Sequence, residues 1–143
     1  MTLKVPETLL RRIKSHALQS LPEECCGFLI GLRGTAKEVL QAVPTRNTAP
    51  SLKERRYTVD PMDFLRIEKG LAGSKQEVLG FYHSHPNAPA RPSKYDLENA
   101  WPIYSYIILS IIEGKVANVA SWTLLPNPRQ FGKEDLLIMR SKD

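Results

Sequence analysis

The sequence has only two cysteines among its 143 residues, and they are adjacent, at Cys25 and Cys26. Neighbouring residues of a strand point to opposite faces, so these two are poor candidates for a disulfide with each other. Neither belongs to a C-x-x-C pair, which argues against a zinc-finger or thioredoxin-like site. The cysteine content therefore suits a reducing compartment.

Long apolar runs are also missing. The N-terminus has no apolar core of signal-peptide length. The most apolar run, 103–112, is too short to span a bilayer and carries Ser105 and Ser110. We therefore expect a protein with no membrane segment and a cytoplasmic location.

The excess of positive charge is small, with a net charge of +5. The basic residues are scattered apart from short clusters at 11–14 and 53–56, and no aromatic-rich platform accompanies them. We therefore expect no nucleic-acid binding. A charge of this size is compatible with an acidic protein partner and also with simple solubility.

The composition is that of an ordinary globular protein, with 42% hydrophobic and 24% charged residues. The length is sufficient for one hydrophobic core, and we predict that residues 1–143 form one domain. Strand and helix patterns mix without a clean βαβ alternation. They predict a single mixed α/β domain in which a curved mixed sheet is flanked by helices.

The local patterns place these elements along the chain. Apolar periodicity and Pro, Asp and Gly signals predict helices at 6–20, 62–71 and 93–101. Alternating or continuous apolar stretches predict strands at 25–32, 37–43, 57–59, 78–85, 103–112 and 116–125. The segment 131–139 fits a strand or a helix equally well.

The strand at 78–85 carries two histidines, His83 and His85, whose spacing puts both imidazoles on one face. A Pro-rich loop follows, and then Ser93 and Asp96 share the first turn of the next helix. Histidine nitrogens and a carboxylate are zinc ligands, and catalytic zinc sites keep a fourth position open for water. The stretch is therefore a candidate for a catalytic metal site.

Simpler interpretations exist for each piece. Two strand histidines can be surface or core residues, and the pair Ser93 and Asp96 also matches a helix capping box. Glu23 and Glu24 can both be loop carboxylates beside Pro22, which is the favoured interpretation from the residues alone. Alternation would nevertheless put Glu24 on the face of Cys26, Phe28 and Ile30, where burial would raise its pKa.

The combination resembles a known family. His83-Ser84-His85-Pro86, followed at matching spacing by Ser93 and Asp96, resembles the JAMM motif of the JAMM/MPN+ metallopeptidases, also called Mov34/MPN/PAD-1. The segment 22–27, Pro-Glu-Glu-Cys-Cys-Gly, resembles the P-x-E-x-C-G segment of the bacterial members. This match aligns Glu24, and not Glu23, with the catalytic glutamate of the family.

The resemblance implies a mechanism. His83, His85 and Asp96 would hold one Zn²⁺ per chain, Glu24 would be the general base, and Ser93 would hydrogen-bond the developing oxyanion. Cys26 could be read as a fourth ligand, but the family comparison favours a buried thiol.

The resemblance also bears on fold and substrate contacts. It implies an MPN fold, related in layout to the cytidine deaminases. Deamination itself is disfavoured, because the H-x-E and P-C-x-x-C signature is missing from this sequence. Asn87 and Arg91, in the loop beside the metal site, are weaker candidates for substrate contacts.

The family suggests the substrate as well. The short chain resembles the small bacterial members, which implies hydrolysis of a peptide or isopeptide bond at the C-terminus of a ubiquitin-like sulfur-carrier protein. Two alternatives stay open, a non-catalytic MPN scaffold and a zinc hydrolase of a small amide. We also consider a homodimer.

Overall fold

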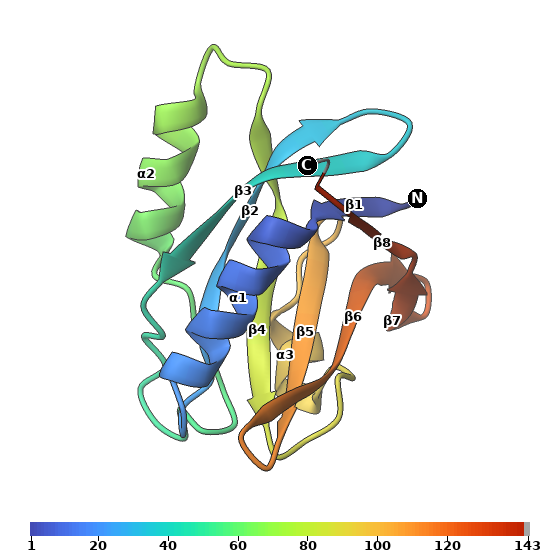
Figure 1. Cartoon of the computed structure of the whole chain (residues 1–143). Helices are drawn as coiled ribbons and strands as arrows, with labels where there is room; N and C mark the ends of the chain where they lie inside the picture. Colours follow the sequence, from blue (N-terminus) through green and yellow to red (C-terminus); the bar gives the residue numbers. More distant parts are fainter. Residues whose placement is uncertain (142–143) are drawn as a thin grey trace.

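The computed structural model describes residues 1–141 and consists of one curved sheet with helices on both faces (Figure 1). The helices are α1 (Glu7–Gln19), α2 (Pro61–Leu71) and α3 (Lys94–Asn99). The strands are β1 (Leu3–Pro6), β2 (Cys26–Arg33), β3 (Lys37–Thr45), β4 (Glu77–Pro86), β5 (Ser105–Ile112), β6 (Lys115–Pro126), β7 (Arg129–Glu134) and β8 (Leu136–Met139). The expected mixed α/β fold is confirmed.

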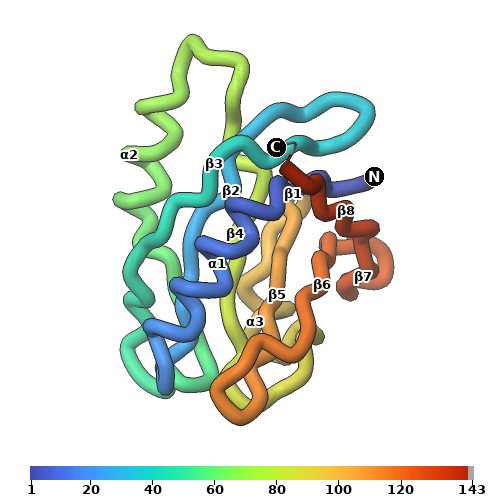
Figure 2. The backbone as a smooth tube through the Cα atoms, in the orientation of Figure 1, coloured from blue at the N-terminus to red at the C-terminus, as the bar shows by residue number. Residues whose placement is uncertain are grey.

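The sheet is strongly curled. Its strand order is β7-β6-β5-β4-β2-β3-β1-β8, so β7 and β8 form the two opposite edges. Only Asp135 separates these two strands in the sequence. One residue spans about 3.5 Å of chain, so the edges must approach each other where β7 passes into β8. Figure 2 shows β6, β7, β8 and β1 gathered on one side of the molecule.

Each face of the sheet has its own core. On one face, α1 buries Leu9, Leu10, Ile13 and Ala17 against apolar side chains of the central strands, and it lies in front of the sheet in Figure 1. The opposite face is rich in aromatic rings. There Phe28 and Phe81 of the sheet pack against Phe64 of α2, with ring centroids less than 6 Å apart.

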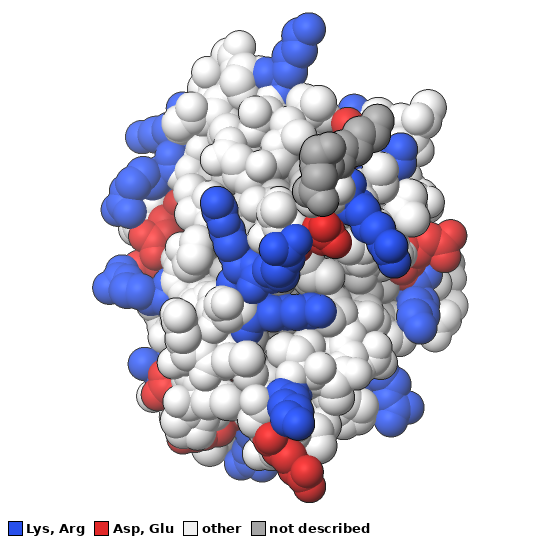
Figure 3. Space-filling view, viewed as in Figure 1, with Lys and Arg blue, Asp and Glu red and all other residues white. Residues whose placement is uncertain are grey.

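The polar side of α1 faces solvent. Lys and Arg side chains gather over this helix in the space-filling view (Figure 3). The helix carries Arg11 and Arg12, which are exposed, and Lys14, which is half-buried. This grouping is what the outer face of an amphipathic helix produces. Among the helices within residues 1–141, none is long and apolar enough to cross a membrane.

The central strands decide where the site lies. β2 pairs antiparallel with β4, and β4 pairs parallel with β5 through the crossover that contains α3. The start of β2 and the end of β4 therefore lie at the same end of the sheet. Most residues of β2, β4 and β5 are buried, as their nearly continuous apolar sequences predict.

Several boundaries differ from the sequence prediction. Residues 57–59 are not a strand. The N–H of Thr58 bonds to the side chain of Asn47, and the carbonyl of Thr58 accepts from the N–H of Thr48, so these backbone groups are not paired with a neighbouring strand. The third helix ends at Asn99. The following strand begins only at Ser105, after Ile103 adopts a positive φ of 73°.

The termini were the least predictable part of the fold. The sequence does not predict β1, because its four residues pair in parallel with β3 and β8, which are far away in the sequence. The undecided segment 131–139 is resolved as most of β7 followed by β8. Short strands of this kind depend on partners that local patterns do not reveal.

A buried ion pair ties the curled sheet together. Lys37 of β3 donates to Glu134 of β7 at 2.9 Å and to Ser105 of β5 at 2.6 Å. Ser121 of β6 donates to the second carboxylate oxygen of Glu134 at 2.9 Å. Both charged side chains are at most 5% exposed. The network links four strands where the curl brings them together.

We expect the substitution Lys37→Met to destabilise the protein by about 3–5 kcal/mol, because it leaves the Glu134 carboxylate buried without its cation. Urea unfolding followed by circular dichroism measures this difference. The exposed pair of Arg11 and Glu7 supplies the control, and Arg11→Ala should leave the unfolding midpoint nearly unchanged. Equal effects of the two substitutions would contradict a structural role for the buried pair.

Candidate active site

The last residues of β4 deliver both histidines to one buried face of the sheet. The side chains of His83 and His85 are only 1% and 5% exposed. The neighbouring Ser84 faces the other way and accepts a hydrogen bond from the N–H of Cys25 at 2.8 Å. The alternation that the sequence predicts is therefore confirmed, and Ser84 holds β2 against β4.

Three side-chain atoms converge at this point. The Nε2 atoms of His83 and His85 lie 3.1 Å apart, and Oδ2 of Asp96 lies 3.1 Å from the first and 3.0 Å from the second. Ligand atoms at 2.0–2.1 Å from a tetrahedral zinc would lie about 3.3 Å apart. The separations in the structure are close to that value.

The hydrogen bonding of His85 favours a cation between these atoms. Its Nδ1 lies 2.8 Å from the carbonyl oxygen of Pro89, which can only accept. Nδ1 must therefore carry a proton, and in the neutral ring Nε2 has a lone pair directed at the carboxylate of Asp96. Two lone pairs that face each other at 3.0 Å repel, so this geometry suits a positively charged occupant.

Asp96 takes part in two structures at once. Its Oδ2 accepts from the N–H of Ser93, and the Ser93 hydroxyl oxygen accepts from the N–H of Asp96, so the capping box is present at the start of α3. The capping and metal interpretations of this pair are thus compatible. Burial raises the pKa of Asp96, but the neighbouring His83 and the Ser93 N–H outweigh it and hold the pKa well below its usual range.

Glu24 completes the cluster from the segment just before β2. It is 3% exposed, and one of its carboxylate oxygens lies within 4.8 Å of ring nitrogens of His83 and His85. Within the described residues, its Oε1 is buried without a hydrogen-bond partner. Burial, with Asp96 nearby, raises the pKa of Glu24 to about 9. A bound cation would favour the ionised form of this carboxylate.

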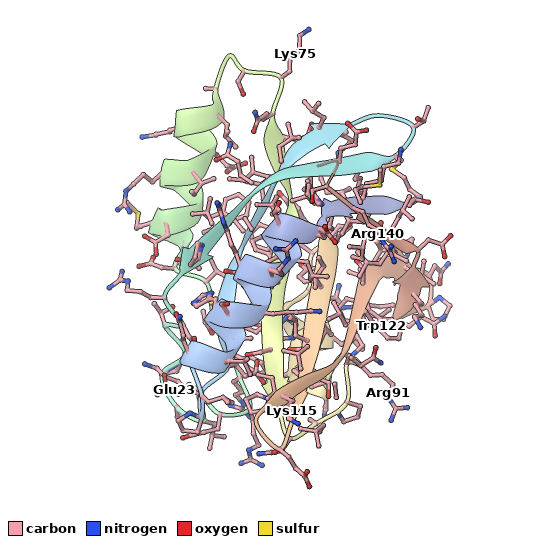
Figure 4. The ribbon with its side chains drawn as sticks, in the orientation of Figure 1. Glu23, Lys75, Arg91, Lys115, Trp122 and Arg140 are labelled. Carbon is pink, nitrogen blue, oxygen red and sulfur yellow. The ribbon has the colours of Figure 1, made fainter. Side chains whose placement is uncertain are left out.

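Glu23 lies in a different environment. It is exposed, and its N–H bonds to the carbonyl of Ser20 at the end of α1. Figure 4 shows its side chain at the outer surface of the molecule. Both glutamates precede β2, as the interpretation of them as loop carboxylates expects, but Glu24 differs from Glu23 in being buried beside the histidines.

The Sγ of Cys26 is directed toward the end of β3 and is not part of the group formed by Glu24, His83 and His85. Its Sγ lies 3.5 Å from the carbonyl of Arg46 and 4.0 Å from that of Thr45, at the end of β3. Burial raises the pKa of Cys26 to about 12, so the group stays a thiol at neutral pH. The donor set at the site therefore consists of imidazole nitrogens and carboxylate oxygens, which suits Zn²⁺ and related divalent cations.

Some contacts of the site could not be found in the sequence. The ring of Tyr57 stacks on His83 with centroids 4.2 Å apart and an interplanar angle of 22°. Outside the cluster, His16 of α1 bonds through Nδ1 to the hydroxyl of Tyr82 at 2.7 Å. Tyr57 and His16 belong to segments distant from the motif, and no local pattern marks them.

The two weaker substrate-contact candidates lie outside the converging group. Asn87 is exposed and has a positive φ of 59°, and its N–H bonds to the carbonyl of Ile111. Arg91 is exposed, and Figure 4 shows it extending from the surface. The loop that carries them is held by Trp122, whose Nε1 donates to the carbonyl of Ala90 at 3.0 Å.

The fold and the site together define a compact α/β domain with a buried His, His and carboxylate cluster. The model of the family described as prokaryotic homologues of the JAB domain matches residues 6–125. The chain belongs to this family, and the resemblance inferred from the motif is confirmed.

Curated relatives and solved structures agree with this assignment. A probable TtuB-protein conjugate cleaving protease of Thermus thermophilus is 35% identical over 76% of this chain and 70% of the relative. A desampylase of Haloferax volcanii is 34% identical over 73% of this chain and 74% of the relative. A solution structure of a Desulfitobacterium hafniense protein is 28% identical, covers 97% of this chain and 94% of that protein, and has a TM-score of 0.84.

We expect the protein to bind one zinc per chain, because the separations between the three donor atoms are close to those between the ligands of a tetrahedral zinc. Elemental analysis gives the stoichiometry, and thermal unfolding gives the accompanying stabilisation. Free zinc at 100 times its Kd should add about 2.7 kcal/mol to the free energy of unfolding.

The double substitution His83→Ala and His85→Ala should abolish both the zinc content and the stabilisation. His16→Ala is the matched control, because it removes an imidazole that lies outside the cluster. Full zinc occupancy in the double variant would show that the metal binds elsewhere.

Proposed function

We propose that this protein is a zinc-dependent peptidase that hydrolyses a peptide or isopeptide bond at the C-terminus of a ubiquitin-like sulfur-carrier protein. The observation that carries the proposal is the convergence of His83, His85 and Asp96, with the buried carboxylate of Glu24 beside them. Membership of the JAB family supports a zinc-dependent hydrolase. The relatives named as a conjugate-cleaving protease and a desampylase support a protein conjugate as substrate.

In this proposal, His83, His85 and Asp96 are the three protein ligands. Zinc held there would act as a Lewis acid, which polarises a carbonyl and lowers the pKa of a water molecule to about 7. The carbonyl of Pro89 orients the ring of His85, and Ser93 orients the carboxylate of Asp96. The thiol of Cys26 is directed elsewhere, so the protein ligands leave a coordination position for water and substrate.

Glu24 is the proposed proton carrier. Its carboxylate is buried beside the histidines and is not engaged by a cation of the described residues, so it can take a proton from the attacking water. The same group then returns the proton to the leaving amine. Burial and the neighbouring Asp96 raise its proton affinity, which helps it to hold the proton between the two steps.

Ser93 is the proposed donor to the developing oxyanion. Its hydroxyl oxygen is used as the acceptor of the capping box, so the hydroxyl hydrogen stays available. A donor held by a helix start beside the metal ligands is pre-organised, which is the condition under which such hydrogen bonds stabilise a transition state.

The cytoplasmic location, the homodimer and the substrate contacts of Asn87 and Arg91 stay predictions.

The substrate class is tested with ubiquitin-like carrier proteins that bear short C-terminal extensions. We expect zinc-loaded protein to release the extension, and intact mass spectrometry of both products identifies the bond. A free peptide with the sequence of the carrier tail is the matched substrate without the folded part. Equal cleavage of the peptide would favour a hydrolase of small amides, and zinc-loaded protein that cleaves neither substrate would favour the scaffold alternative.

We expect Glu24→Gln to lower kcat by about 10²–10⁴-fold, because a positioned acid or base typically contributes that factor. The substitution keeps the size of the side chain and leaves the three proposed ligands intact, so zinc content and thermal stability should be preserved. Glu23→Gln should remain close to wild type, since Glu23 is exposed. An inactive Glu23→Gln beside an active Glu24→Gln would refute the assignment of the base.

A further inference from the structure

The side chain of Asn47 is fully engaged in hydrogen bonds. Its Nδ2 donates to the carbonyl of Glu24 at 3.1 Å and to the carbonyl of Arg56 at 2.9 Å. Its Oδ1 accepts from the N–H of Ala49 at 3.0 Å and of Thr58 at 3.2 Å. A primary amide has two N–H donors and two acceptor sites, so this side chain uses its full capacity.

These four bonds join two parts of the site. Arg56 and Thr58 flank Tyr57, whose ring stacks on His83 at 4.2 Å. One amide therefore fixes the backbone of Glu24 relative to the segment that packs on His83. None of the hydrogen bonds of Asn47 within the described residues goes to His83 or His85, and Asn47 lies in the irregular connection 46–60 between β3 and α2.

Glu24 needs such support because the sheet does not hold it. The β2 ladders with β3 and β4 begin only at Cys26. The N–H of Glu24 bonds to the carbonyl of Lys53 at 2.8 Å, and its carbonyl accepts from Asn47. Both backbone groups are thus held by the connection 46–60, while Oε1 of the carboxylate has no hydrogen-bond partner within the described residues.

We propose that Asn47 is a positioning residue that fixes Glu24 for proton transfer by tying its backbone to the segment around Tyr57. The proposal rests on the function proposed above, since it assigns to Glu24 the role of the general base. Asn47 acts only through other residues, because its own polar atoms are consumed by backbone groups.

The first test compares kcat and KM of Asn47→Ala, Asn47→Asp and the control Thr48→Val at saturating zinc. Asn47→Ala should lower kcat by roughly 10–100-fold with little change in KM, since a misplacement of about 1 Å can cost that much. Asn47→Asp should lose about as much, because it lacks the donors to Glu24 and Arg56.

Thr48→Val is the matched control for these variants. It removes a hydrogen bond to the carbonyl of Thr58 across the same connection but none to Glu24. It should stay within about threefold of wild type, well below the effect expected of a displaced catalytic group. A comparable loss in Thr48→Val would assign the effect to general loosening of the segment and overturn the proposal.

A double-mutant cycle with Glu24→Gln shows whether Asn47 acts through the base. If it does, Asn47→Ala should change kcat by less than about threefold in the Glu24→Gln background, because the positioned group is already lost. The two effects should therefore be strongly non-additive. Additive losses would overturn the proposal.

Hydrogen exchange supplies a readout that does not depend on activity. In Asn47→Ala, the N–H groups of Glu24 and Thr58 should exchange faster, while those of the central strands and the zinc content stay unchanged. Unchanged exchange at Glu24 would overturn the proposal. A further outcome is that the wild-type protein cleaves no carrier fusion while Asn47→Ala still speeds hydrogen exchange at the Glu24 N–H. In that case the proposed function fails, while the structural link from Asn47 to Glu24 stands.

Discussion

The site depends on the antiparallel pairing of β2 with β4. In this ladder Cys26 lies opposite His83, so continuing the register places Glu24 beside His85. The N–H of Cys25 bonds to the hydroxyl of Ser84, which fixes that register from the other face of the sheet. A slip by one residue would turn Glu24 and both histidines to opposite faces. The chemistry proposed for this chain therefore rests on a register that buried apolar residues and one serine hold in place.

In the cluster, the same polar groups stabilise the fold and line the proposed metal site. Asp96 closes the capping box of α3 and also faces both histidines, and the carbonyl of Pro89 decides the tautomer of His85. A carboxylate that was only a cap would not need two buried imidazoles beside it. Such a group of lone pairs is unfavourable in a buried site unless a cation or protons occupy the space between them.

The rest of the fold holds these parts at fixed distances. The sheet curls until β7 and β8 approach, and the pair of Lys37 and Glu134 links its strands away from the site. The connection 46–60 has little regular structure but is ordered by the amide of Asn47. It supplies Tyr57 and the backbone partners of Glu24, as irregular segments on a rigid scaffold often do for functional sites.

The sequence by itself determined the main helices and strands, the shared face of His83 and His85, and the family, because these follow from local periodicity and from a spaced motif. It could not decide between Glu23 and Glu24 without that motif, since both are adjacent carboxylates beside a proline. Only the tertiary structure showed that Glu24 is buried, that Tyr57 covers His83 and that Asn47 links them. It also decided β1 and β8, because these short strands pair with partners that are distant in the chain, and it showed that β7 is a strand paired with its neighbour β6.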